Sequence, residues 1–264
     1  MANWSTGNSI KITDYERIEI KKPHVENEFV IQFQQHLEAA KQGDAEAMGK
    51  VASDYEIGWG VLRDKQEAFH WRLEAAKHGH AKSQFIVAFE YEEAKDKREA
   101  FRWYLKAAKQ GDVLSQYEVA KYYEKGDGMP QDEREAFRWY LKAAKQGYAL
   151  SQYKVAEYYE KGYGMPQDKQ EAFRWYLEAA KQGNEFAQYK VAVCYIDGEG
   201  TKANEEEGLN WMRLSAQKGH WEATDYLQKR EATIQDSSSN SQEEGFEEII
   251  EDEFEIIEDE FLIE

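Results

Sequence analysis

The sequence is poor in cysteine and proline: its 264 residues include one cysteine and three prolines. The single thiol, Cys194, excludes a disulfide framework and any metal site built from several cysteines. It is also typical of a chain that folds in a reducing compartment. Because proline interrupts the interior of a helix, its scarcity favours long helices.

Long apolar runs are missing as well. Residues 1–22 lack the unbroken apolar stretch of a secretory signal. No later window approaches the roughly 20 apolar residues that a helix needs to cross a bilayer. These absences predict a soluble protein of the cytoplasm without membrane insertion, and they leave delivery into a host cell open.

Positive charge is in short supply, with 34 lysines and arginines against 52 acidic residues and a formal net charge of −18. Residues 243–264 alone hold twelve acidic residues and no basic one. A chain with this balance has no electrostatic attraction for phosphate backbones or anionic membranes. We therefore expect other proteins as partners and no nucleic acid.

Repetition is what the sequence has in abundance. Tryptophans recur in steps of 32, 36, 36 and 36 residues, at Trp71, Trp103, Trp139, Trp175 and Trp211. Glycines that can end a helix keep the same step, at Gly43, Gly79, Gly111, Gly147, Gly183 and Gly219. An Asp or Asn followed three residues later by Glu opens one helix of every unit, as in a capping box, at Asp64, Asp96, Asp132, Asp168 and Asn204.

Each unit contains two amphipathic helices joined by a loop, and such pairs become stable only when neighbours bury their apolar faces. The sequence predicts an all-α protein, a right-handed α/α superhelical solenoid of about five two-helix repeats with helical caps and an acidic C-terminal tail. The expected repeats span 44–79, 80–111, 112–147, 148–183 and 184–219, with capping helices at 27–42 and 221–234. In the shortest unit, four residues are missing between Tyr91 and Asp96, so we expect a tighter turn there.

These motifs resemble the Sel-one-like repeat family, which is related to the tetratricopeptide repeats. The resemblance is carried by the first-helix segment 188–195, by Gly198 and Gly200, and by the second-helix segment 136–144, which contains Ala136, Trp139 and Ala144. It implies a solenoid that acts as a protein-binding scaffold or adaptor. With one cysteine, the chain differs from the family's cysteine-rich branch.

The two ends differ from the repeats. Residues 1–26 are expected to be weakly structured or disordered, and residues 235–264 form a polar linker and an acidic–hydrophobic tail. Its acidic runs are interleaved with Phe246, Ile249, Ile250, Phe254, Ile256, Ile257 and Phe261. This pattern indicates either a solvating tail or a short segment that binds a partner.

The resemblance implies that the first helices line a concave groove. Their positions off the packing stripe are the candidate partner contacts: Glu118, Lys121, Tyr122, Lys125, Lys154, Glu157, Tyr158, Lys161 and Lys190. Tyr122 and Tyr158 fit equally well as groove anchors or as packing residues.

The sequence predicts no catalytic residues, cofactor or metal, because His78 and His80 lack the companions that a metal site requires. A non-enzymatic scaffold or adaptor that binds through the groove, the tail or both is therefore the leading prediction. The alternatives are a regulatory subunit of an enzyme or signalling complex, autoinhibited by its own tail, and a solenoid that binds a small ligand or carries out catalysis.

Overall fold

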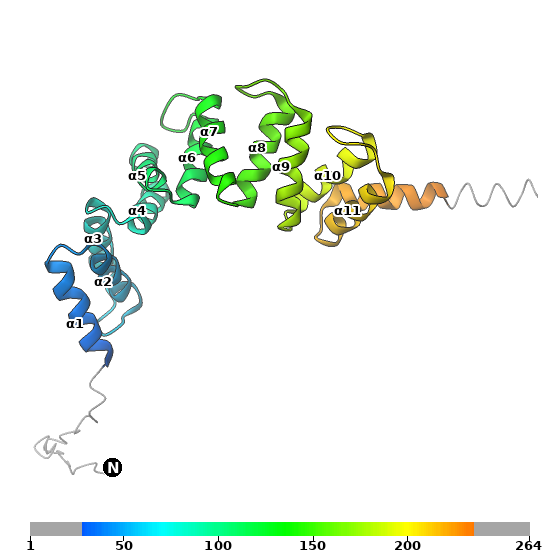
Figure 1. Ribbon diagram of the computed structural model, residues 1–264. Helices are drawn as coiled ribbons and strands as arrows, with labels where there is room; N and C mark the ends of the chain where they lie inside the picture. The colour runs from blue at the N-terminus through cyan, green and yellow to red at the C-terminus, as the bar shows by residue number, and fades with distance from the viewer. Residues whose placement is uncertain (1–27, 235–264) are drawn as a thin grey trace, which may run out of the picture. The chain divides into compact units, whose positions relative to one another are not determined.

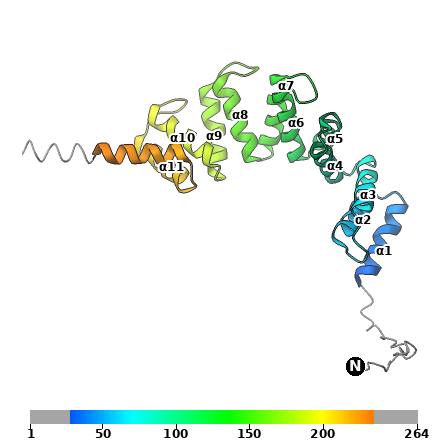
Figure 2. The ribbon, with the colours of Figure 1, turned by 180° about the vertical axis from the view of Figure 1, so that it is seen from behind.

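A computed structural model describes residues 28–234, and every regular element within them is a helix (Figures 1 and 2). This confirms the predicted all-α repeat fold. The helices are α1 (Glu28–Lys41), α2 (Ala45–Ile57), α3 (Lys65–Lys77), α4 (Ala81–Glu93), α5 (Lys97–Lys109), α6 (Val113–Lys125), α7 (Glu133–Lys145), α8 (Ala149–Lys161), α9 (Lys169–Lys181), α10 (Glu185–Asp197), α11 (Glu205–Gln217) and a last helix over 221–234.

The chain divides into two compact units. Unit 1 ends at Val87 and contains α1, α2, α3 and the first part of α4, and unit 2 begins at Ala88 and contains the remaining helices. Helices occupy both segments for which caps were expected, as α1 and the helix over 221–234. The expectations for residues 1–26 and 235–264 lie outside the described residues.

The second helix of each repeat begins at the position that its capping residue predicts. The side chains of Asp132 and Asn204 accept hydrogen bonds from the backbone N–H groups three residues on, at 3.0 and 3.2 Å. Asp64, Asp96 and Asp168 do the same for their own helices. A side chain at this position replaces one of the hydrogen bonds that the first turn of a helix lacks.

Small residues allow the helices of unit 2 to pack closely. Val119, Ala120, Ala143 and Ala144 are fully buried or nearly so, and their counterparts in the next repeat are buried in the same way. Alanine brings two helix backbones together without the entropy cost of ordering a long side chain. Consecutive helices from α5 to α11 consequently lie side by side in chain order (Figures 1 and 2).

A glutamine at the fourth position of α4, α6, α8 and α10 ties each of these first helices to the helix before it, whereas α2 has Met48 at that position. In unit 2 the Gln116 side chain donates to the carbonyl oxygen of Ala108 at 3.2 Å, and Gln152 donates to that of Ala144 at 3.3 Å. Both glutamines are buried. The bond satisfies a buried amide and fixes the register between neighbouring repeats.

Four of the five loops between paired helices contain glycines with positive φ. Gly126 ends α6 in the left-handed conformation, with φ of 72°, and Gly200 also has a positive φ and packs against the backbone of the preceding repeat. A Cβ at Gly200 would lie 2.1 Å from the carbonyl oxygen of Lys169. In the shortest unit only residues 94–96 separate α4 from α5, with Lys95 at a φ of 64°, so the predicted tighter turn is present.

Candidate protein-binding surface

The charged candidate contacts of unit 2 lie on one face of its first helices, which we call the first-helix face. It is formed by positions 2, 6, 9 and 13 of each helix, which share one side because an α-helix has 3.6 residues per turn. The residues are Leu114, Glu118, Lys121 and Lys125 in α6, Leu150, Lys154, Glu157 and Lys161 in α8, and Phe186, Lys190, Val193 and Asp197 in α10.

The charged residues of this face pair with one another. Lys121 Nζ lies 2.6 Å from a carboxylate oxygen of Glu118 in the same helix. Lys154 Nζ contacts Glu157 at 3.1 Å and, in the preceding repeat, Glu124 at 3.4 Å. These pairs leave few uncompensated charges in the middle of the face.

Two further lysines follow the same pattern. Lys190 Nζ lies 3.0 Å from Glu160 of the preceding repeat, and Lys161 contacts Glu157 at 3.7 Å. Burial alone would lower the pKa of Lys154, but Glu157 and Glu124 raise it above its usual value. Four of the five lysines of the face, Lys121, Lys154, Lys161 and Lys190, are therefore matched by glutamates.

An apolar row lies at the N-terminal end of the first-helix face. Leu114 is 44% exposed, Leu150 43% and Phe186 50%, and the three residues occupy position 2 of successive first helices. A single exposed leucine is ordinary, whereas apolar side chains repeated on one face are typical of an interaction surface. These three residues were not among the predicted contacts, although a leucine or phenylalanine off the packing stripe recurs there every 36 residues in the sequence.

Tyr122 and Tyr158 do not lie on the accessible surface. They are only 3% and 1% exposed. The Tyr158 ring lies 5.8 Å from that of Tyr140, and the Tyr122 ring 6.0 Å from that of Tyr104. Of the two roles that the sequence left open for them, these contacts are those of packing residues.

The tyrosines of the second helices form a recurring arrangement that we call the tyrosine–glutamate pairs. At position 8 of the second helices, Tyr104, Tyr140 and Tyr176 donate their hydroxyl hydrogens to Glu92, Glu124 and Glu160, at 3.0, 2.9 and 2.9 Å. Burial and then the charge of the facing carboxylate raise the pKa of each of these tyrosines far above its usual value. They stay neutral donors across the physiological range.

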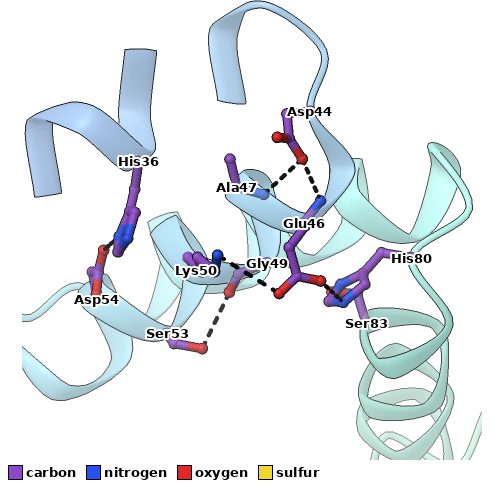
Figure 3. Close-up of polar contacts among 10 residues, drawn as sticks. All are labelled: His36, Asp44, Glu46, Ala47, Gly49, Lys50, Ser53, Asp54, His80 and Ser83. Atoms are coloured by element: carbon purple, nitrogen blue, oxygen red, sulfur yellow. Dashed lines mark hydrogen bonds and ion pairs between the residues drawn. The ribbon is translucent and has the colours of Figure 1, made fainter. Parts of the chain in front are cut away.

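Unit 1 has ionisable residues at the same positions. Arg72 replaces the position-8 tyrosine and pairs with Glu56, the counterpart of Glu124. His36, at the matching position of α1, contacts Asp54 through Nδ1 at 2.7 Å (Figure 3). Asp54 stands where α6 and α8 carry Tyr122 and Tyr158, so polar contacts replace the packed rings.

A second histidine completes this cluster. Nδ1 of His80 lies 2.8 Å from the Ser83 hydroxyl oxygen, and its Nε2 lies 3.0 Å from a carboxylate oxygen of Glu46 (Figure 3). Position 5 of α2 is Gly49, whereas α6, α8 and α10 carry Tyr117, Tyr153 and Tyr189 there. A Cβ on Gly49 would lie 2.7 Å from His80, so the glycine allows the imidazole to approach α2.

The missing ring leaves a cavity of about 150 Å³ in unit 1, which we call the unit 1 cavity. Two helices supply its charged rim, Glu46 and Lys50 from α2 and Lys82 from α4, and Arg72 reaches it from α3. The remaining lining residues are His36, Gly49, Ser53, Asp54, His80, Ser83 and Ile86.

The described residues offer little to metal or thiol chemistry. Within 28–234, no three His, Cys, Asp or Glu side chains are grouped so that they could hold a metal ion. Burial and then the charge of Glu160 raise the pKa of the Cys194 thiol to about 11. Because the thiolate is the nucleophile, this cysteine is a poor one at neutral pH.

Comparison with known proteins decides the family. The model of the Sel1 repeat matches residues 45–80, 81–112, 113–148, 149–184 and 186–220, one or two residues beyond the bounds expected from the sequence. The chain belongs to the Sel1 repeat family. Repeats of this family generally mediate protein–protein interaction, and their fold is typically a non-catalytic scaffold.

Solved structures with this repeat are similar to the chain. A Sel1 repeat protein from Oxalobacter formigenes is 27% identical with a TM-score of 0.62, and the match covers 75% of this chain and 86% of that one. A protective antigen present in uropathogenic Escherichia coli strains, with an SLR fold, is 29% identical with a TM-score of 0.61. That match covers 74% of this Sel1 repeat chain and 43% of the antigen.

Two further searches, one of known proteins and one of the helices themselves, find nothing. The search of curated proteins finds no match to this sequence. Within residues 28–234, none of the helices is long and apolar enough to span a membrane.

Proposed function

We propose that this Sel1 repeat protein is a non-enzymatic scaffold or adaptor that binds a partner protein through the first-helix face of unit 2. The observation that carries the proposal is the apolar row of Leu114, Leu150 and Phe186, exposed on three successive helices. Such a row favours a partner whose apolar side chains are spaced like the neighbouring first helices.

The charged part of the face supports specificity more than affinity. Exposed ion pairs contribute little free energy, but their alternating signs penalise a partner with the wrong charge pattern. Lys125 is exposed at the end of α6 and makes no ion pair within residues 28–234. A partner that combines apolar anchors with acidic groups near Lys125 would complement this surface.

The acidic tail is a second proposed binding element, through Phe246, Ile249, Ile250, Phe254, Ile256, Ile257 and Phe261. An alternative is that the tail folds back and inhibits the scaffold. The lysines available to its carboxylates on the first-helix face are largely matched by glutamates, which favours a tail that acts on another protein.

The test is quantitative affinity purification from the native lysate with mass spectrometry. The full-length chain is compared with L114E/L150E, with a chain truncated after Gln235, and with the control L62E/L214E, whose leucines are also exposed but lie outside the first-helix face. We expect L114E/L150E to lose the partner and L62E/L214E to keep it.

The outcomes separate the two binding elements. Loss of the partner on truncation alone would move recognition to the tail. Equal recovery by L114E/L150E and the full-length chain would contradict the proposed face. Partner recovery that increases on truncation, and for the full-length chain on raising the salt concentration, would identify the tail as an inhibitor, because salt screens its carboxylates.

A further inference from the structure

We infer that the unit 1 cavity is a binding site for a carboxylate, in the form of an aspartate or glutamate side chain of a peptide. It differs from the first-helix face of unit 2 in place and in chemistry. The inference does not depend on the proposed partner of that face.

The exchange of residues in unit 1 is the first reason. Arg72 and Asp54 are only 5% and 6% exposed, and buried charges cost desolvation energy that packed rings do not. Gly49 adds a further cost, because a glycine inside a helix is about 1 kcal/mol less favourable than alanine. These changes lower the stability of the repeat, and at the same time they create a cavity lined by charged side chains. A binding site accounts for both.

The distribution of hydrogen-bonding capacity is the second reason. The two acidic groups of the cavity are already engaged, Asp54 by His36 and Glu46 by His80. The lysines are not: Lys50 reaches Glu46 only at 3.9 Å, and Lys82 makes no ion pair within residues 28–234. A lysine carries three donors and no acceptor, so an acceptor ligand at the rim replaces water on these two exposed ammonium groups.

Charge and size agree with this assignment. Arg72 is paired with Glu56, so Lys50 and Lys82 are the cations of the lining that lack a close carboxylate, although the protein as a whole has a net charge of −18. The volume of about 150 Å³ compares with about 30 Å³ for each water in the liquid. A carboxylate with one or two methylene groups fits it, and binding it to two ammonium groups gives short charge-assisted hydrogen bonds.

The unit 2 repeats provide an internal contrast. The ring of Tyr189 stacks on His220, the counterpart of His80, with centroids 4.7 Å apart and planes at 18°. Position 2 of the first helix is Glu46 in α2 and Lys82 in α4, but Leu114, Leu150 and Phe186 in unit 2. The same positions thus form an apolar row in one unit and a charged pocket in the other.

The experiment uses the full-length chain with isotope-labelled histidine. NMR signals of the His36 and His80 imidazoles are followed during titration with acetyl-Gly-Glu-Gly-amide, and His220, which lies in unit 2, is the internal reference. Acetyl-Gly-Gln-Gly-amide is the uncharged control, acetyl-Gly-Gly with a free C-terminus tests a chain-end carboxylate, and inorganic phosphate tests other anions. We expect saturable shifts of His36 and His80 with the glutamate peptide and none with the glutamine peptide.

Exposed lysines supply the matched variants, since their replacement leaves the core intact. K50Q/K82Q should weaken the binding of the glutamate peptide about tenfold or more, because hydrogen bonds to charged groups are lost. K41Q/K65Q removes the same charge from exposed lysines of unit 1 outside the cavity and should change the affinity less than about twofold. L114E/L150E should leave it unchanged, which separates this site from the proposed function.

Several results would overturn the assignment. These are the absence of saturable shifts at His36 and His80, equal shifts with the glutamine peptide, binding of phosphate alone, and equal weakening by K50Q/K82Q and K41Q/K65Q. Binding of the free C-terminus but not of the glutamate side chain would overturn the assigned source of the carboxylate. Binding of both would support the carboxylate chemistry.

Discussion

Unit 1 and unit 2 use one helix register for two kinds of interior. In unit 2, positions 5 and 10 of α6 and α8 and position 8 of α7 and α9 bring tyrosine rings together, as between Tyr117 and Tyr140 at 5.6 Å. In unit 1 the same positions hold Gly49, Asp54 and Arg72. A repeat backbone therefore does not dictate its interior chemistry.

One position stays the same and shows the limit of this freedom. Position 12 of the first helix is glutamate in α2, α4, α6 and α8, and its partner is Arg72 in unit 1 and a tyrosine hydroxyl in unit 2. A partly buried carboxylate without a donor is costly. The donor can change from hydroxyl to guanidinium, provided that it reaches the same carboxylate.

The largest expected effect is the removal of a ring from unit 2. Y140A should lower the free energy of unfolding by about 3–5 kcal/mol, because it deletes a fully buried aromatic side chain and leaves Glu124 without its hydroxyl donor. Urea unfolding followed by circular dichroism measures it. A loss below about 1 kcal/mol would show that the ring is not a main packing element of the repeat.

Substitutions of Arg72, the unit 1 counterpart of Tyr140, test the interior of unit 1. R72A should also destabilise, by about 1.5–3 kcal/mol, because it removes a buried side chain and its hydrogen bond to a charged group, whereas the half-exposed Glu56 is solvated by water. R72Y places the unit 2 residue opposite Glu56 and should recover most of that loss, since a tyrosine hydroxyl can donate to the same carboxylate. If R72Y is as unstable as R72A in urea, the two interiors are not interchangeable.

The tyrosine–glutamate pairs should make unit 2 sensitive to alkaline pH. Tyr104, Tyr140 and Tyr176 have pKa values raised by burial, so unfolding lets them ionise near their usual pKa of about 10. The unfolded state then binds fewer protons than the folded state, so this stability is fully present below pH 10 and is lost as the pH rises above it, by up to about 1.4 kcal/mol per tyrosine and pH unit.

Unfolding curves at several pH values between 8 and about 11.5, where the usual tyrosine pKa of about 10 is crossed, measure this effect. Y140F/Y176F is the control, because it removes two of the titrating hydroxyls and should flatten the decline. An identical pH dependence for this variant would place the alkaline sensitivity elsewhere.

The smallest expected effect is one in which the two units should agree. D64A in unit 1 and D132A in unit 2 each remove a capping carboxylate, and each should cost about 1 kcal/mol. Thermal unfolding of the two variants measures the difference between them. A markedly larger cost in one unit would show that the units differ in their helix ends as well as in their interiors.

Much of the fold could be predicted because its signals are local. The caps at Asp132 and Asn204, the left-handed Gly126 and the tight turn at Lys95 depend on residues a few positions apart. The positions of Glu118, Lys121, Lys154 and Lys190 on one helix face also follow from periodicity. The exposed row of Leu114, Leu150 and Phe186 was missed because an apolar residue in a helix is by default assigned to the core.

The sequence by itself determined the all-α repeat architecture, the helix ends and the register, since 3.6-residue periodicity and capping act within a helix or a turn. Only the tertiary structure decided which lysines are neutralised, that Tyr122 and Tyr158 are buried, and that Gly49 opens a cavity beside His80. These properties depend on contacts between side chains about one repeat apart in the chain, such as Lys154 with Glu124. Such contacts are set by how neighbouring helices pack.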